Sequence, residues 1–465
     1  MQQLAVFLAG LFTVAALAGC LGSEPKERGD GEEPPAEVWE EGLLVQDLGP
    51  VTAKAAAGAL SMIVAREPAS VQLPQDALLF QDGKFSRPPQ GGLELAANGT
   101  LNFLAPPGLT NLTILVEGEE IVVRTPYNGT SEFVSGWSAI HLEEVQAALF
   151  PNRQPGRPNY VAAQQYYKAW FERHGFAVTI EEFLNTATSA AGCTPRCPNT
   201  AANVVAYRKG TLTPERILAF GAHYDMVPNT KHAAFDDTSG VVEVLELARV
   251  FANVTTQHSL LFGLWGGEES GLVGSNVWAH SNPDKIALMT TYVNLDVSAL
   301  AWPAPYVNPV PVFSSAGPDG PMAERVNAGV ARAWTMAGFP EEMIQYRQVG
   351  RGQAPGQVGG GGGVDAQSDH TSFIAAGVPS TFLFTSNVSA VFAIFHSPRD
   401  TLENMTLLAL DGTRPQDDPG ALANWTAEQW ALGRETLARS LGTFQWTSFY
   451  FVLQAELGDY NPRVR

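Results

Sequence analysis

Basic residues are scarce in this sequence. Lys and Arg together number 28 among 465 residues, against 47 Asp and Glu, which gives a formal net charge of −19 at pH 7. A protein this acidic repels a phosphate backbone, so we do not expect it to bind nucleic acid. The excess of acid instead indicates a solvated acidic surface suited to salty water outside a cell. The chain is also longer than one typical hydrophobic core requires, so we expect two folded units.

Cysteine is almost absent, and the three that occur are Cys20, Cys193 and Cys197. The last two lie in the stretch AGCTPRCPN. Outside the cytosol, two cysteines this close together favour a short-loop disulfide. A zinc site is disfavoured there, because neither a further Cys nor a nearby pair of His is present to complete four ligands.

The apolar run at the N-terminus, in MQQLAVFLAGLFTVAALAGC, is short and lacks the charged flanks of a spanning helix. Small residues follow it, which is typical of an export signal, here over residues 1–20. The ending LAGC resembles the lipobox of prokaryotic lipoproteins, and this implies that Cys20 becomes the lipidated first residue of the mature chain. Two or more acyl chains on one residue suffice for stable anchoring. We therefore expect an exported protein, anchored by lipid to the outer surface of the cell membrane.

A plain secretory signal remains the alternative to a lipoprotein signal. The residues before the apolar run include no Lys or Arg, in contrast to the usual start of such a signal. In that case Cys20 is coincidental and the protein is secreted. Either location fits the seven Asn-x-Ser/Thr sequons, which together predict a glycoprotein. These sequons are at Asn98, Asn111, Asn128, Asn253, Asn387, Asn404 and Asn424.

The composition and the apolar pattern of the sequence change twice after the signal. Residues 21–40 are acidic and rich in Pro, which predicts a flexible tether. Residues 41–132 show short apolar alternations between Gly, Pro and Asn, and LTILVEGEEIVVRT within them is typical of a hairpin. We expect a small β-rich domain here, with a role as either a propeptide or an interaction module.

Residues 135–450 alternate between helical and strand patterns, without an internal repeat. RILAFGAH is typical of a buried strand, SLLFGLWGGEES and ALMTTYVNLD are also expected to form strands, and residues 426–442 are expected to form the final helix. Such alternation predicts an α/β fold with three layers, in which helices cover both faces of a mainly parallel sheet.

Acids and imidazoles gather where the predicted strands end. His223 and Asp225 end one strand, and Asp236 opens the helix that follows. The next two strands end in the pair Glu268 and Glu269 and in Asp296, and His396 follows the last strand after a loop. In an open α/β sheet, ligands bind outside the carboxyl ends of the strands, so these residues should meet.

A metal centre is the least costly explanation for such a gathering, since burying unpaired carboxylates is expensive. Imidazole and carboxylate together suit zinc, and one carboxylate can bridge two ions. Two histidines and three carboxylates are the right number for two zinc ions, each with an open position. The acid left beside them can serve as the base that two-metal hydrolytic sites need.

Six segments resemble the zinc exopeptidase family that includes secreted bacterial aminopeptidases, glutamate carboxypeptidase II and glutaminyl cyclase (metallopeptidase family 28). The segments are GAHYD, DDTSGVVEVLELAR, GGEESGLVGS, NLD, SDHTSF and FHSPRDT, in the order of the family. The resemblance covers about residues 135 to 445 and implies the zinc exopeptidase fold for them. The region before it is not covered.

The resemblance implies a role for each matching residue. His223 and Asp296 would hold one zinc, Glu269 and His396 would hold the other, and Asp236 would bridge the two. The zinc ions would activate a water molecule to hydrolyse a peptide bond, although other divalent transition metals such as cobalt or manganese also suit these ligands.

Two further acids would act beside the ligands. Glu268 would be the general base, and Asp225 would orient His223. Asp237 is interpreted as a helix N-cap, since Thr and Ser follow it. Ser368-Asp369 is interpreted as another cap, so Asp369 and His370 are kept only as possible pocket residues.

The substrate is expected to be the N-terminus of a peptide or protein, because an acidic pocket suits a free ammonium group. A carboxypeptidase or dipeptidase should instead aim an arginine at the C-terminal carboxylate, and Arg347 or Arg351 could serve. Glutaminyl cyclase activity would predict one zinc. A cell-surface binding protein, as in transferrin receptor ectodomains, is the last alternative, but the complete set of ligands and the base argue against it. Several family members have a tyrosine before the last histidine, where this chain has Phe395.

Overall fold

The N-terminal part of the chain forms two antiparallel sheets in the computed structural model. Alternate residues of the strands are buried, as in the burial pattern of β3 and β4, so each strand has one face toward a shared core. The first sheet has the order β1 (Val38–Glu40), β2 (Leu43–Asp47), β3 (Val51–Ala55), β4 (Leu60–Ala65), β9 (Thr100–Leu104), β6 (Leu78–Gln81) and β7 (Lys84–Ser86). The second has the order β11 (Glu119–Arg124), β10 (Asn111–Val116), β5 (Ala69–Gln72) and β8 (Leu93–Leu95).

Strands β10 and β11 form the hairpin that the sequence predicts. Val116 pairs with Glu119, and the two residues between them, Glu117 and Gly118, both have positive φ angles of 52° and 82°. That combination fits a two-residue hairpin turn.

The structure describes residues 37–185, 200–300, 310–314, 320–348, 368–385, 394–411 and 421–460. Side chains of residues 310–314, 320–324, 342, 345–348, 411 and 421 are not among those described. The expected signal and most of the tether lie outside these ranges, as do Cys20, Cys193, Cys197, Asn387 and Arg351. Within them, no helix combines the length and the apolar character needed to cross a membrane.

An eight-stranded mixed sheet forms the body of the rest of the chain. Its order is β12 (Ala177–Leu184), β13 (Thr200–Arg208), β15 (His258–Trp265), β14 (Thr213–His223), β16 (Met289–Leu295), β19 (Ser380–Leu383), β17 (Val310–Ser314) and β18 (Ile344–Gln348). The central run β15–β14–β16–β19 is parallel throughout. Antiparallel pairs join β12 to β13, β13 to β15 and β17 to β19. The predicted parallel sheet is therefore the centre of a mixed one.

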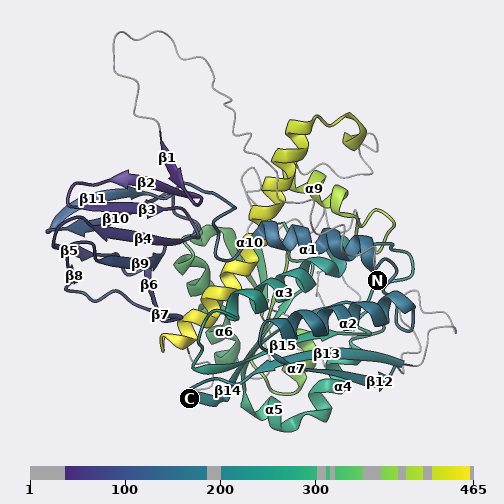
Figure 1. Cartoon of the computed structure of the whole chain (residues 1–465). Helices are drawn as coiled ribbons and strands as arrows, with labels where there is room; N and C mark the ends of the chain where they lie inside the picture. The colour runs from purple at the N-terminus through teal and green to yellow at the C-terminus, as the bar shows by residue number, and fades with distance from the viewer. Residues whose placement is uncertain are drawn as a thin grey trace, which may run out of the picture. The chain divides into compact units, whose positions relative to one another are not determined.

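Helices cover both faces of this sheet (Figure 1). Neighbouring residues of β14 show the division: Leu218 and Phe220 belong to one apolar cluster, and Ile217 and Ala219 to another. The first cluster includes residues of α1 (Gly136–Leu149), α2 (Pro158–Arg173), α3 (Ser239–Phe251), α6 (Gly320–Met336), α9 (Leu402–Asp411) and α10 (Ala427–Glu456). The second includes residues of α4 (Val273–Ser281), α5 (Pro283–Leu288) and α7 (His370–Ala375). The predicted three-layer α/β fold and the β-rich N-terminal region are thus confirmed.

Three short helical segments complete the described elements. They are η1 (Ala234–Thr238), which leads into α3, η2 (Glu341–Met343) and η3 (Ala421–Asn424). The last helix, α10, begins where Thr426 and Gln429 form a capping box. It runs on to Glu456, so the predicted end at residue 442 is wrong.

The β-rich region packs against α10. Phe85 of β7 meets Phe449 of α10 edge-on, with ring centroids 5.7 Å apart. The carbonyl of Gly83 accepts a hydrogen bond of 2.8 Å from the Thr255 amide, and Arg87 forms an ion pair with Asp459. All described residues from Val38 onward belong to one compact unit. The region is therefore part of the packing that supports the last helix.

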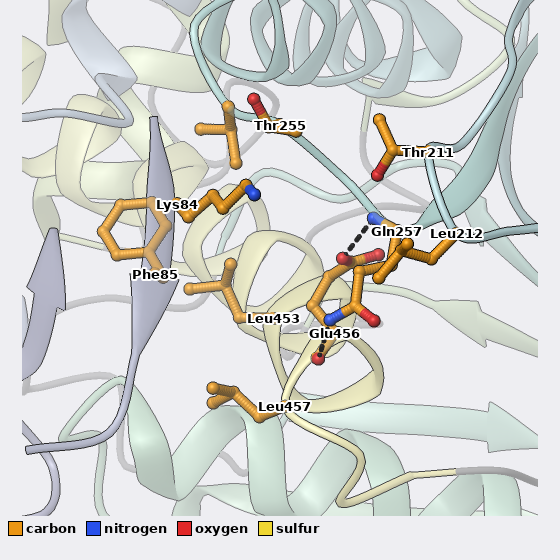
Figure 2. Close-up of a pocket in the computed structure, with 10 residues that line it drawn as sticks. Lys84, Phe85, Thr211, Leu212, Thr255, Gln257, Leu453, Glu456 and Leu457 are labelled. Carbon is orange, nitrogen blue, oxygen red and sulfur yellow. Dashed lines mark hydrogen bonds between the residues drawn. The ribbon is translucent and has the colours of Figure 1, made fainter. Parts of the chain in front are cut away.

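A pocket of about 230 Å³ opens at this contact (Figure 2). Lys84 and Phe85 line it from β7, and Leu453 and Glu456 line it from α10. The Glu456 carboxylate already accepts the amide of Gln257, at 2.5 Å, just before β15. The pocket thus lies where β15 begins, at the end of the sheet opposite the predicted metal ligands.

Candidate metal centre

The predicted site residues lie at the carboxyl ends of three adjacent parallel strands. His223 is the last residue of β14, and Asp296 follows the last residue of β16. Glu268 and Glu269 follow β15 after two glycines, of which Gly267 has a φ of 75°. Because β15, β14 and β16 are neighbours in the sheet, their ends bring these side chains to one edge.

Two groups of potential ligands meet there and share one residue. His223, Asp236 and Asp296 form the first group, and Asp236, Glu269 and His396 form the second. Within each group the ligand atoms all lie within 4.8 Å of one another. The structure therefore brings together all five residues that the sequence singles out.

The two oxygens of Asp236 face different groups. Its Oδ1 lies 3.0 Å from Nε2 of His223, and its Oδ2 lies 3.1 Å from Nε2 of His396. Nε2 of His223 is also 3.7 Å from Oδ1 of Asp296, and Nε2 of His396 is 3.0 Å from Oε2 of Glu269. A carboxylate placed in this way can bridge two cations.

The charge balance of the site tests whether cations fit it. Burial raises the pKa of Glu268 well above its usual range, and nearby Glu269, Asp369 and Asp296 raise it further against the effect of His223. Burial also raises the pKa of Glu269 to about 7 and that of Asp296 to about 6, with repulsion from Asp236 added in both cases. The protein alone thus supplies too little positive charge for its buried acids, and divalent cations would supply it.

The imidazoles respond to the same excess of acid. Burial on its own would lower the pKa of His396, but its hydrogen bonds to Asp236 and Glu269 outweigh this and raise that pKa to about 10. Burial on its own would also lower the pKa of His223, but nearby Glu268 and Asp296 raise it well above its usual range. Both imidazoles direct a ring nitrogen at carboxylates, which is the donor set that zinc prefers.

The thermal stability of the metal-free protein, prepared by treatment with a chelator, should decrease as the pH rises from about 6.5 to about 8. Burial raises the pKa values of Glu269 and Asp369 to about 7. For a carboxyl with a raised folded-state pKa, the stabilisation is complete below the unfolded pKa and is lost as pH rises through the folded one. His396, with its raised pKa, loses its contribution in the same direction.

Zinc should reverse this dependence, because metal ions compete with protons for the same atoms. The rise in Tm on adding zinc should be larger at about pH 8 than at about pH 6.5. Differential scanning fluorimetry with and without chelator measures both quantities. A Tm of the chelated protein that stayed level or increased over this range would contradict an excess of buried acid.

The sequence predicts that Asp225 orients His223. Its Oδ1 lies 3.7 Å from Nδ1 of His223, which is longer than a direct hydrogen bond. The carboxylate also accepts the backbone amides of Glu268 at 3.1 Å and Glu269 at 3.3 Å. It therefore fixes the main chain that carries the proposed base and its neighbouring ligand.

Asp237 does more than cap a helix, which is the role that the sequence suggests for it. Its Oδ1 accepts the amide of Gly240, in the first turn of α3, at 3.0 Å. The same oxygen accepts the amide of Val297 at 3.1 Å, and Oδ2 accepts that of His223 at 3.2 Å. One buried carboxylate thus ties α3 to the ends of β14 and β16.

The sequence alone does not identify Asp400 and Arg153 as residues near the site. Asp400 is fully buried and accepts the amides of Phe235 at 2.6 Å and Asp236 at 3.1 Å. It lies within the FHSPRDT motif, which was the available signal. Arg153 is also fully buried, and its guanidinium donates to the carbonyl of Tyr224 at 3.0 Å and to the hydroxyl of Thr238 at 2.6 Å. Its surroundings in the sequence gave no signal.

The possible pocket residues differ in their surroundings. Asp369 occupies the N-cap position of α7, but its side chain makes no capping hydrogen bond, so that interpretation is wrong. The carboxyl is fully buried instead, and burial raises its pKa to about 7. His370 stacks on Phe382, and burial lowers its pKa to about 3. Phe395 stacks on His396 with ring centroids 3.6 Å apart. The side chain of Arg347 lies outside the described residues, as Arg351 does entirely.

The chain is similar to known peptidases. Residues 203–414 match the model of peptidase family M28. Leupeptin-inactivating enzyme 1 of Streptomyces exfoliatus is 28% identical over 305 residues, which are 61% of this chain and 59% of that protein. The probable lipoprotein aminopeptidase LpqL of Mycobacterium tuberculosis is 31% identical over 187 residues, which are 40% of this chain and 34% of that protein.

Among solved structures, a Zn-dependent exopeptidase from Parabacteroides distasonis aligns with a TM-score of 0.48 and 17% identity, over 70% of this chain and 98% of that one. The chain spans less than two thirds of the length of the two relatives above. The resemblance to metallopeptidase family 28 that the motifs indicate is confirmed for residues 203–414, the stretch that holds all five predicted ligands and Glu268.

Proposed function

We propose that this chain is a zinc-dependent exopeptidase that acts outside the cytoplasm and releases N-terminal residues from peptides. The observation that carries the proposal is the sharing of Asp236 between two groups of ligands at one edge of the sheet. Family M28 and relatives named aminopeptidases support it. The set of donors, two imidazoles and three carboxylates, suits two zinc ions per chain.

His223 and Asp296 would hold one zinc, Glu269 and His396 the other, and Asp236 both. Bound zinc would supply Lewis acidity toward a peptide carbonyl and lower the pKa of water. The proposed ligands come from five separate segments of the chain, so folding must be complete before the site exists. Zinc should therefore add to the stability of the fold.

Glu268 is the proposed general base. Its side chain is 13% exposed and its Oε2 lies 4.0 Å from Nε2 of His223, so it reaches the site without being one of the grouped ligands. The adjacent Glu269 faces the second group, because neighbouring residues at a strand end point in different directions. Glu268 would accept the proton of the attacking water and pass it to the leaving amine.

Preference for N-termini rests on the charge around the site. Glu268, Asp296 and Asp369 are all acids at or beside it, and they interact electrostatically. A free ammonium group of a substrate would be attracted there, whereas a C-terminal carboxylate would be repelled. The proposed location, export with a lipid anchor at Cys20, is supported by the relative named a lipoprotein aminopeptidase.

Zinc content and substrate choice test this proposal together. Protein without residues 1–20 should bind two zinc ions and cleave aminoacyl-anilides, but not the N-acetylated forms of the same anilides. Two zinc ions with no anilide turnover would indicate a carboxypeptidase or dipeptidase. One zinc or none would contradict the proposal and leave the cyclase or a binding protein.

A further inference from the structure

Three buried carboxylates outside the proposed ligands hold the main chain of ligand-bearing segments. Asp225 accepts amides at Glu268 and Glu269, and Asp237 accepts amides at His223 and Val297. Asp400 accepts amides at Phe235 and Asp236. Each of these aspartates lies on the same short segment as one proposed metal ligand. Each holds the main chain of a second segment, which carries a different ligand.

We propose that Asp400 is a positioning residue for the shared ligand Asp236, and that it holds Asp236 in place before any metal binds. The inference rests on the proposed function, since it takes Asp236 to be a ligand of both metal ions. Asp400 itself belongs to neither ligand group. It acts through the two peptides that precede Asp236, at the amides of Phe235 and Asp236.

The geometry of Asp400 suits this role. Both of its oxygens are used, with Oδ1 on the Phe235 amide at 2.6 Å and Oδ2 on the Asp236 amide at 3.1 Å. Its side chain is fully buried, so water does not compete for these amides. A bidentate contact fixes the direction of two successive peptides, and this limits how far the Asp236 carboxylate can turn.

Asp400 itself is held in a well-defined turn. Its amide donates to the carbonyl of Ser397 at 3.1 Å, and the Ser397 hydroxyl accepts the amide of Arg399 at 3.1 Å. Thr401 then accepts the amide of Asn404 at 3.3 Å at the start of α9. His396 directly precedes this turn, so one short segment supplies a ligand of the second group and sets the position of the ligand that both groups share.

Asparagine at position 400 would keep the size of the side chain and break this contact. Its amide nitrogen is a donor, so one of the two backbone amides would face a donor instead of an acceptor. Loss of a partner behind a metal ligand typically costs about 10–100-fold in metal affinity. Because Asp236 belongs to both groups, Asp400→Asn should weaken zinc binding at both sites by about that factor.

Competition with a chromogenic chelator measures zinc affinity independently of turnover. The matched control is Glu143→Gln, since Glu143 is another fully buried acid that interacts electrostatically with Asp400 but holds no ligand-bearing amide among the described residues. The control should bind zinc as the wild type does. Equal losses in both variants, or wild-type affinity in Asp400→Asn, would overturn the inference. The Tm of each chelated variant shows whether the fold is intact.

Hydrogen exchange in the wild-type protein tests the same inference without a substitution. If Asp400 holds the amides of Phe235 and Asp236 before metal binds, both should stay protected after zinc is removed by chelation. Exchange at the rate of an open loop in the chelated protein would show that the metal orders this segment and would overturn the inference. A wild-type protein that binds no zinc, with these amides still protected, would contradict the proposed function alone.

Discussion

Replacing Glu268 with Gln should lower kcat by about two to four orders of magnitude while leaving zinc in place. The amide cannot accept a proton from water, yet it has the size of the carboxyl and the same reach into the site. Glu268 belongs to neither group of potential ligands, so metal binding should not depend on its charge. Turnover of aminoacyl-anilides and zinc content, measured on the same preparation, give both numbers.

The neighbouring residue provides the control. Glu269 lies 3.0 Å from His396 and belongs to the second ligand group. Glu269→Gln should therefore lose zinc affinity as well as activity, and added zinc should restore part of the activity. Glu268→Gln should not respond to added zinc. If Glu268→Gln retained wild-type kcat, another group would have to be the base.

The proposed ligands could be found from the sequence because each follows a strand or opens a helix. His223 and Asp296 end buried apolar runs, and the topology of a parallel sheet brings such ends together whatever the details of packing. The same rule predicts the order of the central strands only in part. It does not predict that β12, β13 and β17 pair antiparallel with their neighbours, because the direction of pairing depends on long-range contacts that leave no local pattern.

The positioning residues were harder to predict, for a physical reason. Asp400 acts on amides more than 160 residues away in the sequence, and the FHSPRDT motif that contains it does not indicate which amides its carboxyl holds. Arg153 is a buried charge whose partners are backbone carbonyls and a hydroxyl, and carbonyls occur at every residue. Such contacts follow from tertiary packing and have no signature in residue type or spacing.

The length of α10 shows the same limit. The capping box at Thr426 and Gln429 correctly marks its start, since a cap is a local interaction. Its extension to Glu456 depends on burial: Phe449 packs against Phe85 of the β-rich region, and Trp446 lies against Gly58. A helix buried on all sides has no polar face, so the periodic pattern that would have extended the prediction is missing.

Replacing Asp236 with Ala should have the widest effect on metal content. This residue alone belongs to both ligand groups, with Oδ1 toward His223 and Oδ2 toward His396. Its loss removes one donor from each group, and both zinc sites should weaken by more than the roughly 10–100-fold that loss of an outer partner costs. Activity should fall with metal occupancy, and recovery should require a large excess of zinc.

Asp296→Ala is the matched comparison, since Asp296 belongs to the first group only. It should weaken one zinc site and leave the second with wild-type affinity. Zinc titration of the chelated proteins, followed by calorimetry, distinguishes two weak sites from one weak and one strong site. If Asp236→Ala kept one zinc at wild-type affinity, Asp236 would serve a single ion, and the site would contain two independent metals or one catalytic metal rather than a bridged pair.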